Sequence, residues 1–206
     1  PPPSPRMEAL IELLRETPRD EVFAAALRAT GDYRELLRAV WLAGVRGVRP
    51  RPVGFKLHAV MMVPAALDLA ELTPPRERMM PVLFNLDDYK RAQALDDRQA
   101  GGWDLPPRPE VAADADEARR LDVRAARESL ARALRENDDE RAQARASELS
   151  GRVPLDELFE LLWPAAIRDY ASLGHKAIFA DHALRALLEL GPVDPDPVLR
   201  SLVHGL

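Results

Sequence analysis

The sequence predicts an all-α protein, a helical bundle or array built from two related three-helix units. Three observations support this prediction. Apolar residues recur at the spacing of one helical face through most of the 206 residues. No segment alternates polar and apolar residues over more than a few positions, so no strand is required. Two stretches, residues 35–46 and 157–168, also share five identical positions.

The similarity between the two halves extends over three successive helices. Each stretch contains a tryptophan, Trp41 or Trp163, and is followed by an apolar helix with a histidine near its start. A third apolar helix then follows, at residues 78–84 and 198–204. A small helical unit cannot bury its own apolar face, so we expect the two units to pack together with both tryptophans in the core. Chance similarity between Ala- and Leu-rich helices is the alternative.

Capping residues predict where the first helices begin. Residues 7–16 show apolar positions at helical spacing. Thr17-Pro18 predicts an N-cap and a first-turn proline for a helix that ends near residue 29. Asp32 and Glu35 predict a capping box at the start of the Trp41 helix, because each side chain can bond backbone N–H groups of the first turn.

Prolines and glycines divide the rest of the chain. Pro64 should kink a helix over residues 54–71, because proline lacks a backbone N–H. The Gly- and Pro-rich loop after residue 100 separates the halves of a single domain. The predicted parts are a first half of about 1–100, a loop of 101–113 and a second half of about 114–206. Further helices are expected at residues 73–99 with a bend at Pro81, 114–135, 138–149, and from 154 to the end.

Composition excludes several classes of protein. The formal net charge of −5 argues against a nucleic-acid partner, which requires a basic surface. The absence of cysteine excludes disulfides and thiolate chemistry. No apolar stretch is long enough to span a bilayer, so we expect no membrane association and a cytoplasmic location. Familiar nucleophile and phosphate-binding motifs are also absent.

His58 is the first candidate for chemistry. On a helical projection it lies on the apolar side, where an unpaired imidazole is costly to bury. One interpretation gives His58 a catalytic acid–base role shared with His175, or a role as a ligand. The other is a core histidine hydrogen-bonded to a backbone carbonyl.

His175, His182 and Glu189 form a row at seven-residue spacing on one helical face. With His58 they make a candidate metal set whose donors suit Fe, Zn or Mn. A solvated helix face is the alternative. No metal-binding signature such as His-Glu-x-x-His accompanies the row.

Four basic residues, Arg46, Arg49, Arg51 and Lys56, lie in or just beyond a proline-broken loop with no acid among them. They could bind the phosphate or carboxylate of a nucleotide cofactor. A solvated basic loop is the ordinary alternative. The acidic pairs Asp87-Asp88 and Asp96-Asp97 are interpreted as caps or ion pairs, because adjacent helix residues point in different directions.

The segment from Leu173 to Arg185, with the matching segment at Lys56 to His58, resembles the histidine-bearing helices of the questin oxidase-like family. The resemblance covers two short segments. It implies an all-helical oxidoreductase that oxygenates aromatic polyketides with NADPH, with His58, His175 and His182 as pocket residues. The chain is short for such an enzyme.

Two functional hypotheses follow. The first is an oxidoreductase, monooxygenase-like, whose pocket between the two units is lined by histidines, binds a small-molecule substrate and uses iron or NADPH. The second is a non-catalytic helical-repeat scaffold that binds another protein. The last apolar helix would be covered by a partner, by a second copy in a homodimer, or by a longer natural chain.

Overall fold

Helices form all the regular secondary structure of the residues that the computed structural model describes, namely 2–108, 123–168 and 173–206. The predicted all-α class is therefore confirmed. In chain order the helices are α1 (Pro5–Glu16), α2 (Val22–Ala29), α3 (Tyr33–Gly47), the short 3-10 helix η1 (Phe55–Leu57), α4 (His58–Met61), α5 (Val63–Leu72), the 3-10 helix η2 (Pro75–Glu77), α6 (Met79–Ala100), α8 (Val123–Glu136), α9 (Asp139–Leu149), α10 (Leu155–Ala166), α11 (His175–Glu189) and α12 (Pro195–Gly205). The end of the predicted loop and the start of the predicted helix at residue 114 lie outside the described residues.

The α3 helix begins at the predicted cap. The Asp32 side chain accepts hydrogen bonds from the backbone N–H groups of Arg34 and Glu35. The Glu35 carboxylate does not complete the capping box, because the backbone N–H of Asp32 donates to the Thr30 hydroxyl at 3.1 Å, and that hydroxyl in turn donates to Glu35 at 2.6 Å. Only the Asp32 half of the prediction is therefore confirmed.

The predicted start of the second helix was wrong. Thr17 ends α1 instead of capping α2, and its hydroxyl donates to the carbonyl of Leu13 at 2.6 Å. The next residues form a turn in which the N–H of Glu21 bonds the carbonyl of Pro18, so α2 begins only at Val22. A threonine can cap a helix or bond back within one, and the sequence does not distinguish these roles.

Pro64 breaks the predicted helix of residues 54–71 more strongly than a kink would. The segment consists of η1, α4 and α5, and Met62 stands between α4 and α5 with non-helical geometry. Pro64 lies in the first turn of α5, where its missing N–H costs no helical hydrogen bond. Pro81 lies in the first turn of α6 for the same reason, so α6 needs no bend there.

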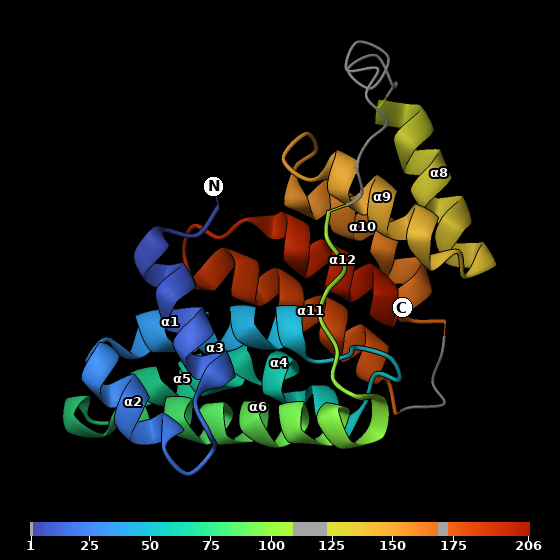
Figure 1. The fold of residues 1–206 in the computed structure, drawn as a ribbon. Coiled ribbons are helices and arrows are strands. Elements are labelled where there is room, and N and C mark those ends of the chain that lie inside the picture. The colour runs from blue at the N-terminus through green and yellow to red at the C-terminus, as the bar shows by residue number, and fades with distance from the viewer. Residues whose placement is uncertain (1, 109–122, 169–172) are drawn as a thin grey trace.

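The α3 helix is central to the core. It packs against α1, α4, α5, α6 and α12, and Trp41 in its middle is fully buried. Figure 1 shows α1 to α6 on one side of the molecule, α11 and α12 crossing its middle, and α8 to α10 on the other side. Buried side chains from both halves belong to one continuous apolar cluster.

Two arginines of α3 bind the end of α11. The Arg38 guanidinium donates to the carbonyl of Leu190, with Nε at 2.8 Å. Arg34 donates to the carbonyl of Glu189 at 2.8 Å. Carbonyls in the last turn of a helix have no partner within it, so these bonds both satisfy the end of α11 and hold it against α3.

The predicted duplication is not confirmed. In the first half the histidine helix is broken into η1, α4 and α5, whereas α11 is one continuous helix. Trp41 is fully buried, but Trp163 is only partly buried and packs against Phe159, with ring centroids 6.0 Å apart.

A search of the described helices for a membrane-spanning candidate finds none with the necessary length and apolar character.

Candidate functional site

His58 and His175 meet between the two halves of the chain. Their Nε2 atoms lie 3.4 Å apart and their rings are stacked, with centroids 5.6 Å apart. At this distance one Nε2 can donate a hydrogen bond that the other accepts, so the pair shares a single proton between its facing nitrogens. The separation is at the long end of the hydrogen-bond range, which makes the bond weak.

Phe55 covers this histidine pair. Its ring lies edge-on to both imidazoles, with centroids 5.2 Å from His58 and 5.5 Å from His175. Burial lowers the pKa of His58 below its ordinary value, and the neighbouring His175 lowers it further, against a smaller opposing effect of Asp88. His58 is therefore a neutral imidazole at neutral pH, which is the form that accepts a proton.

A strained turn directly precedes His175 in the chain. Leu173 and Gly174 both adopt left-handed backbone conformations, with φ of 55° and 78°, directly before α11. This conformation suits glycine but costs a residue such as leucine about 1 kcal/mol. The Leu173 side chain is exposed, so its own packing does not offset the cost. Strained residues of this kind are concentrated at functional sites.

His182 lies apart from the pair. Its Nδ1 atom contacts the carbonyl of Met61, at the break between α4 and α5. A carbonyl can only accept, so Nδ1 of His182 carries the proton and donates. The sequence suggested a histidine bonded to a backbone carbonyl at His58, but this arrangement is found at His182. The partner of His58 is His175.

The four predicted metal ligands do not converge. Glu189 pairs with Arg185 at 3.2 Å, and His182 is bonded to a backbone carbonyl. Within residues 2–108, 123–168 and 173–206, no group of three or more His, Asp or Glu side chains is placed to hold a metal ion. The structure thus brings together only His58 and His175.

The predicted cofactor-binding residues are distributed over three partners. Arg46 forms a two-bond ion pair with Glu8 of α1, and Arg51 forms one with Asp139 of α9. Lys56 pairs with the buried carboxylate of Asp96 at 2.5 Å. The same carboxylate accepts the backbone N–H of Arg49 at 2.8 Å. Arg46 lies in the last turn of α3, and its pair joins α3 to α1, while the other contacts join the loop and η1 to α6 and α9. The four residues therefore do not surround one anion, and their cofactor role stays a prediction.

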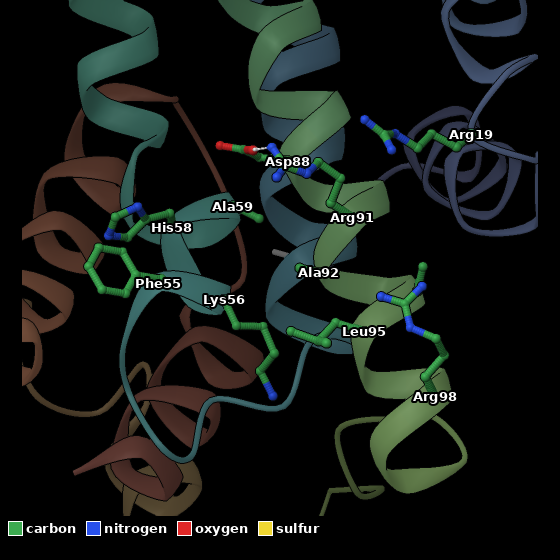
Figure 2. Close-up of a pocket in the computed structure, with 11 residues that line it drawn as sticks. Arg19, Phe55, Lys56, His58, Ala59, Asp88, Arg91, Ala92, Leu95 and Arg98 are labelled. Carbon is green, nitrogen blue, oxygen red and sulfur yellow. Dashed lines mark hydrogen bonds and ion pairs between the residues drawn. The ribbon is translucent and has the colours of Figure 1, made fainter.

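A pocket of about 470 Å³ lies beside the histidine pair. Figure 2 shows Phe55 and His58 on one wall and the side chains of α6 on the other. The volume is within the range of small-molecule sites. The lining residues are Arg19, Phe55, Lys56, His58, Ala59, Asp88, Arg91, Ala92, Ala94, Leu95 and Arg98.

The α6 wall of this pocket was not identified from the sequence, although a signal was present. Asp88, Arg91, Leu95 and Arg98 follow the three- and four-residue spacing of one helical face, which brings them to the same side of α6. Asp88 forms the expected ion pair with Arg91, whose nearest nitrogen lies 3.5 Å away. What the spacing could not show is that η1 and α4 lie opposite and close the pocket.

A comparison of the chain with protein-family models, with curated proteins and with solved structures finds no match, so its candidate function rests on the geometry of this site.

Proposed function

We propose that this protein transfers a proton to or from a small molecule bound in the pocket beside His58. The observation that carries the proposal is the contact between His58 and His175, because His58 both lines the pocket and touches a second imidazole. A partly buried titratable group with a lowered pKa, placed in a cavity of this size, is typical of a catalytic acid or base.

The histidine pair can act as a proton relay. Nε2 of His58 faces His175, so Nδ1 is the nitrogen available to a bound molecule. In the proposed step Nδ1 takes a proton from an acidic C–H or O–H group of the substrate, and the Nε2 proton of His58 passes to Nε2 of His175. The electron pair of the broken bond stays on the substrate. Return of the protons reverses the sequence.

Deuterium exchange tests this proposal without knowledge of the natural substrate. Phenylacetone is a neutral carbon acid small enough for the pocket, and its benzylic C–H exchanges with heavy water when a base removes the proton. We expect the protein to accelerate this exchange, as measured by proton NMR. His58→Gln should remove the acceleration.

His182→Gln is the matched control, because it changes a histidine outside the pocket. It should retain the exchange, and thermal unfolding should show that both variants are folded. Exchange at the background rate with the unaltered protein, or equal exchange with His58→Gln, would overturn the proposal.

The oxidoreductase hypothesis places its pocket between the two units, whereas the residues that line the pocket beside His58 all belong to the first half. Two imidazoles do not make the donor set that a protein-bound iron requires, and the predicted NADPH-binding loop is paired with carboxylates. The residues that the structure describes therefore do not fit either group. Elemental analysis and the absorption spectrum of the purified protein test this hypothesis, since near-stoichiometric iron or a bound chromophore would support it.

Protein binding is a second candidate function, supported by apolar side chains exposed on neighbouring helices. Leu69 and Leu72 of α5 are 56% and 85% exposed, and Met80 and Phe84 of α6 are 64% and 70% exposed. Contiguous exposed apolar surface is typical of interfaces. Light scattering over a range of protein concentrations, compared with Leu72→Lys, tests whether this surface binds a second copy. A monomer at every concentration would count against self-association.

A further inference from the structure

The pocket beside His58 has an excess of positive charge. Four cationic side chains line it, Arg19, Lys56, Arg91 and Arg98, and Asp88 is the one carboxylate among the described lining residues. A concave site lined mainly by one sign of charge concentrates ligands of the opposite sign. The natural ligand is therefore expected to carry negative charge.

Two of these cations are already neutralised by strong pairs. The guanidinium of Arg19 donates two hydrogen bonds to Asp87, at 2.7 and 2.8 Å. The ammonium of Lys56 lies 2.5 Å from Asp96, whose side chain is 3% exposed. Such two-bond and buried pairs keep their partners, so Arg19 and Lys56 shape the pocket more than they bind a ligand.

Arg91 and Arg98 are the cations left for a ligand. Arg91 makes one long contact with Asp88, and its side chain is 62% exposed, so the pair is weak and a ligand can compete for it. Within the described part of the chain no carboxylate forms an ion pair with Arg98. Both guanidinium groups are thus available to a bound anion.

The two arginines lie on the same side of α6. They are separated by seven residues, which is two helical turns or about 10 Å along the axis. Figure 2 shows the side chain of Arg98 directed along α6 toward the Arg91 side. An arginine side chain is long enough to cover much of that separation, so both can reach one anionic group between them.

Apolar side chains lie between the two arginines and opposite them. Ala92 and Leu95 lie between the two arginines on α6, and Phe55 and Ala59 lie across the pocket. We propose that the pocket binds a small organic anion, with a phosphate or carboxylate group held by Arg91 and Arg98 and an apolar body against Leu95. The reacting part of the ligand then lies toward His58.

This inference names the substrate class of the proposed proton-transfer function, and its catalytic meaning rests on that function. Anion binding itself needs only α6. A failure of anion binding therefore leaves the deuterium exchange of neutral phenylacetone unaffected, and a failure of that exchange leaves anion binding intact.

Phenyl phosphate and phenol form a matched pair of probes, because they share a ring and differ in charge. In a titration followed by protein NMR, phenyl phosphate should bind at least about tenfold more tightly than phenol. Arg91→Gln and Arg98→Gln should each weaken phenyl phosphate binding by about tenfold and leave phenol binding unchanged. Raising the salt concentration should weaken the binding of phenyl phosphate and leave the binding of phenol unchanged.

Arg132→Gln is the control for a lost surface charge, because Arg132 is an exposed residue of α8, at the far end of the molecule from α6 in Figure 1. It should bind phenyl phosphate like the unaltered protein. Asp88→Asn removes the lining carboxylate and should tighten binding. Equal affinity for the two probes, or phosphate binding that survives the double substitution of Arg91 and Arg98, would overturn the inference.

Discussion

The ring of Phe55 lies edge-on to the imidazole of His175, with their centroids 5.5 Å apart, although Phe55 itself is 76% exposed. An exposed aromatic side chain usually stabilises the fold little, because most of its ring stays in water. Here it shields a polar pair from water and forms one wall of the neighbouring pocket. Phe55 therefore links the burial of the histidine pair to the shape of the candidate binding site.

Removal of this ring should raise the pKa of His58. Burial is the largest cause of the lowered value, so Phe55→Ala should move the pKa of His58 upward toward the ordinary value of 6.5. The measurement is the pH titration of the histidine ring signals by NMR. Phe84→Ala, at a similarly exposed position on α6, is the control and should leave His58 unchanged. An unchanged pKa in Phe55→Ala would show that the ring does not shield the pair.

Acidification below pH 6.5 should destabilise the fold. Burial lowers the pKa of both His58 and His204 in the folded protein, while both keep the ordinary value of about 6.5 when unfolded. Above that pH the two states bind these protons equally, and below it the unfolded state binds more, so stability falls as pH falls toward the folded pKa.

Urea denaturation between pH 8 and pH 5.5 measures this dependence. The loss of unfolding free energy on acidification should be smaller in His58→Gln and in His204→Gln, and smallest in the double variant. Asp139, whose carboxylate lies 3.6 Å from Nδ1 of His204, favours the protonated form, but burial has the larger effect on the pKa of His204. Identical slopes in all four proteins would contradict the prediction.

Gly44 allows α3 and α4 to approach closely. A Cβ atom added there would lie 2.9 Å from Cγ2 of Val60, which is shorter than a normal contact. Gly44→Ala should therefore destabilise the protein by about 1–3 kcal/mol, as overpacking of a core does. Gly31→Ala is the matched control, because nothing lies within 4 Å of the added atom. Chemical denaturation should show a change in the first variant much larger than in the second.

Asp196 and Arg200 form a buried ion pair one turn apart on α12. Their atoms lie 3.0 Å apart and both side chains are 7% exposed. Asp196→Asn should cost about 3 kcal/mol, because it leaves the Arg200 charge buried without its carboxylate. The exposed pair Arg124 and Glu128 has the same spacing, so Glu128→Gln should change stability by under about 0.5 kcal/mol.

Thermal unfolding of the two variants measures this difference. The hydroxyl of Ser147 and the guanidinium of Arg108 also lie near Asp196, which extends the polar cluster from α12 to α9 and to the loop after α6. A loss at Asp196 no larger than that at Glu128 would show that water reaches the buried pair.

The sequence determined the helices of this protein and several of their boundaries. Apolar residues at helical spacing and the Asp32 cap act within one or two turns of chain, so they can be interpreted without knowledge of the rest of the molecule. The helix of residues 138–149 is likewise confirmed as α9, with Asp138 as its cap. Thr17 shows where local reasoning failed, because one side chain can cap a helix or bond back into the one before.

Only the tertiary structure decided which side chains meet. His58 and His175 are 117 residues apart, and the sequence offered a backbone carbonyl as the partner of His58, or a ligand or metal shared with His175. The packing of α4 against α11 instead brought the two imidazoles into direct contact, and it placed the carbonyl of Met61 beside His182. The partner of Lys56 was decided in the same way, because α6 brings Asp96 to it across 40 residues. Such pairings depend on how helix faces are oriented in the core, and no repeat or spacing within a single helix encodes that orientation.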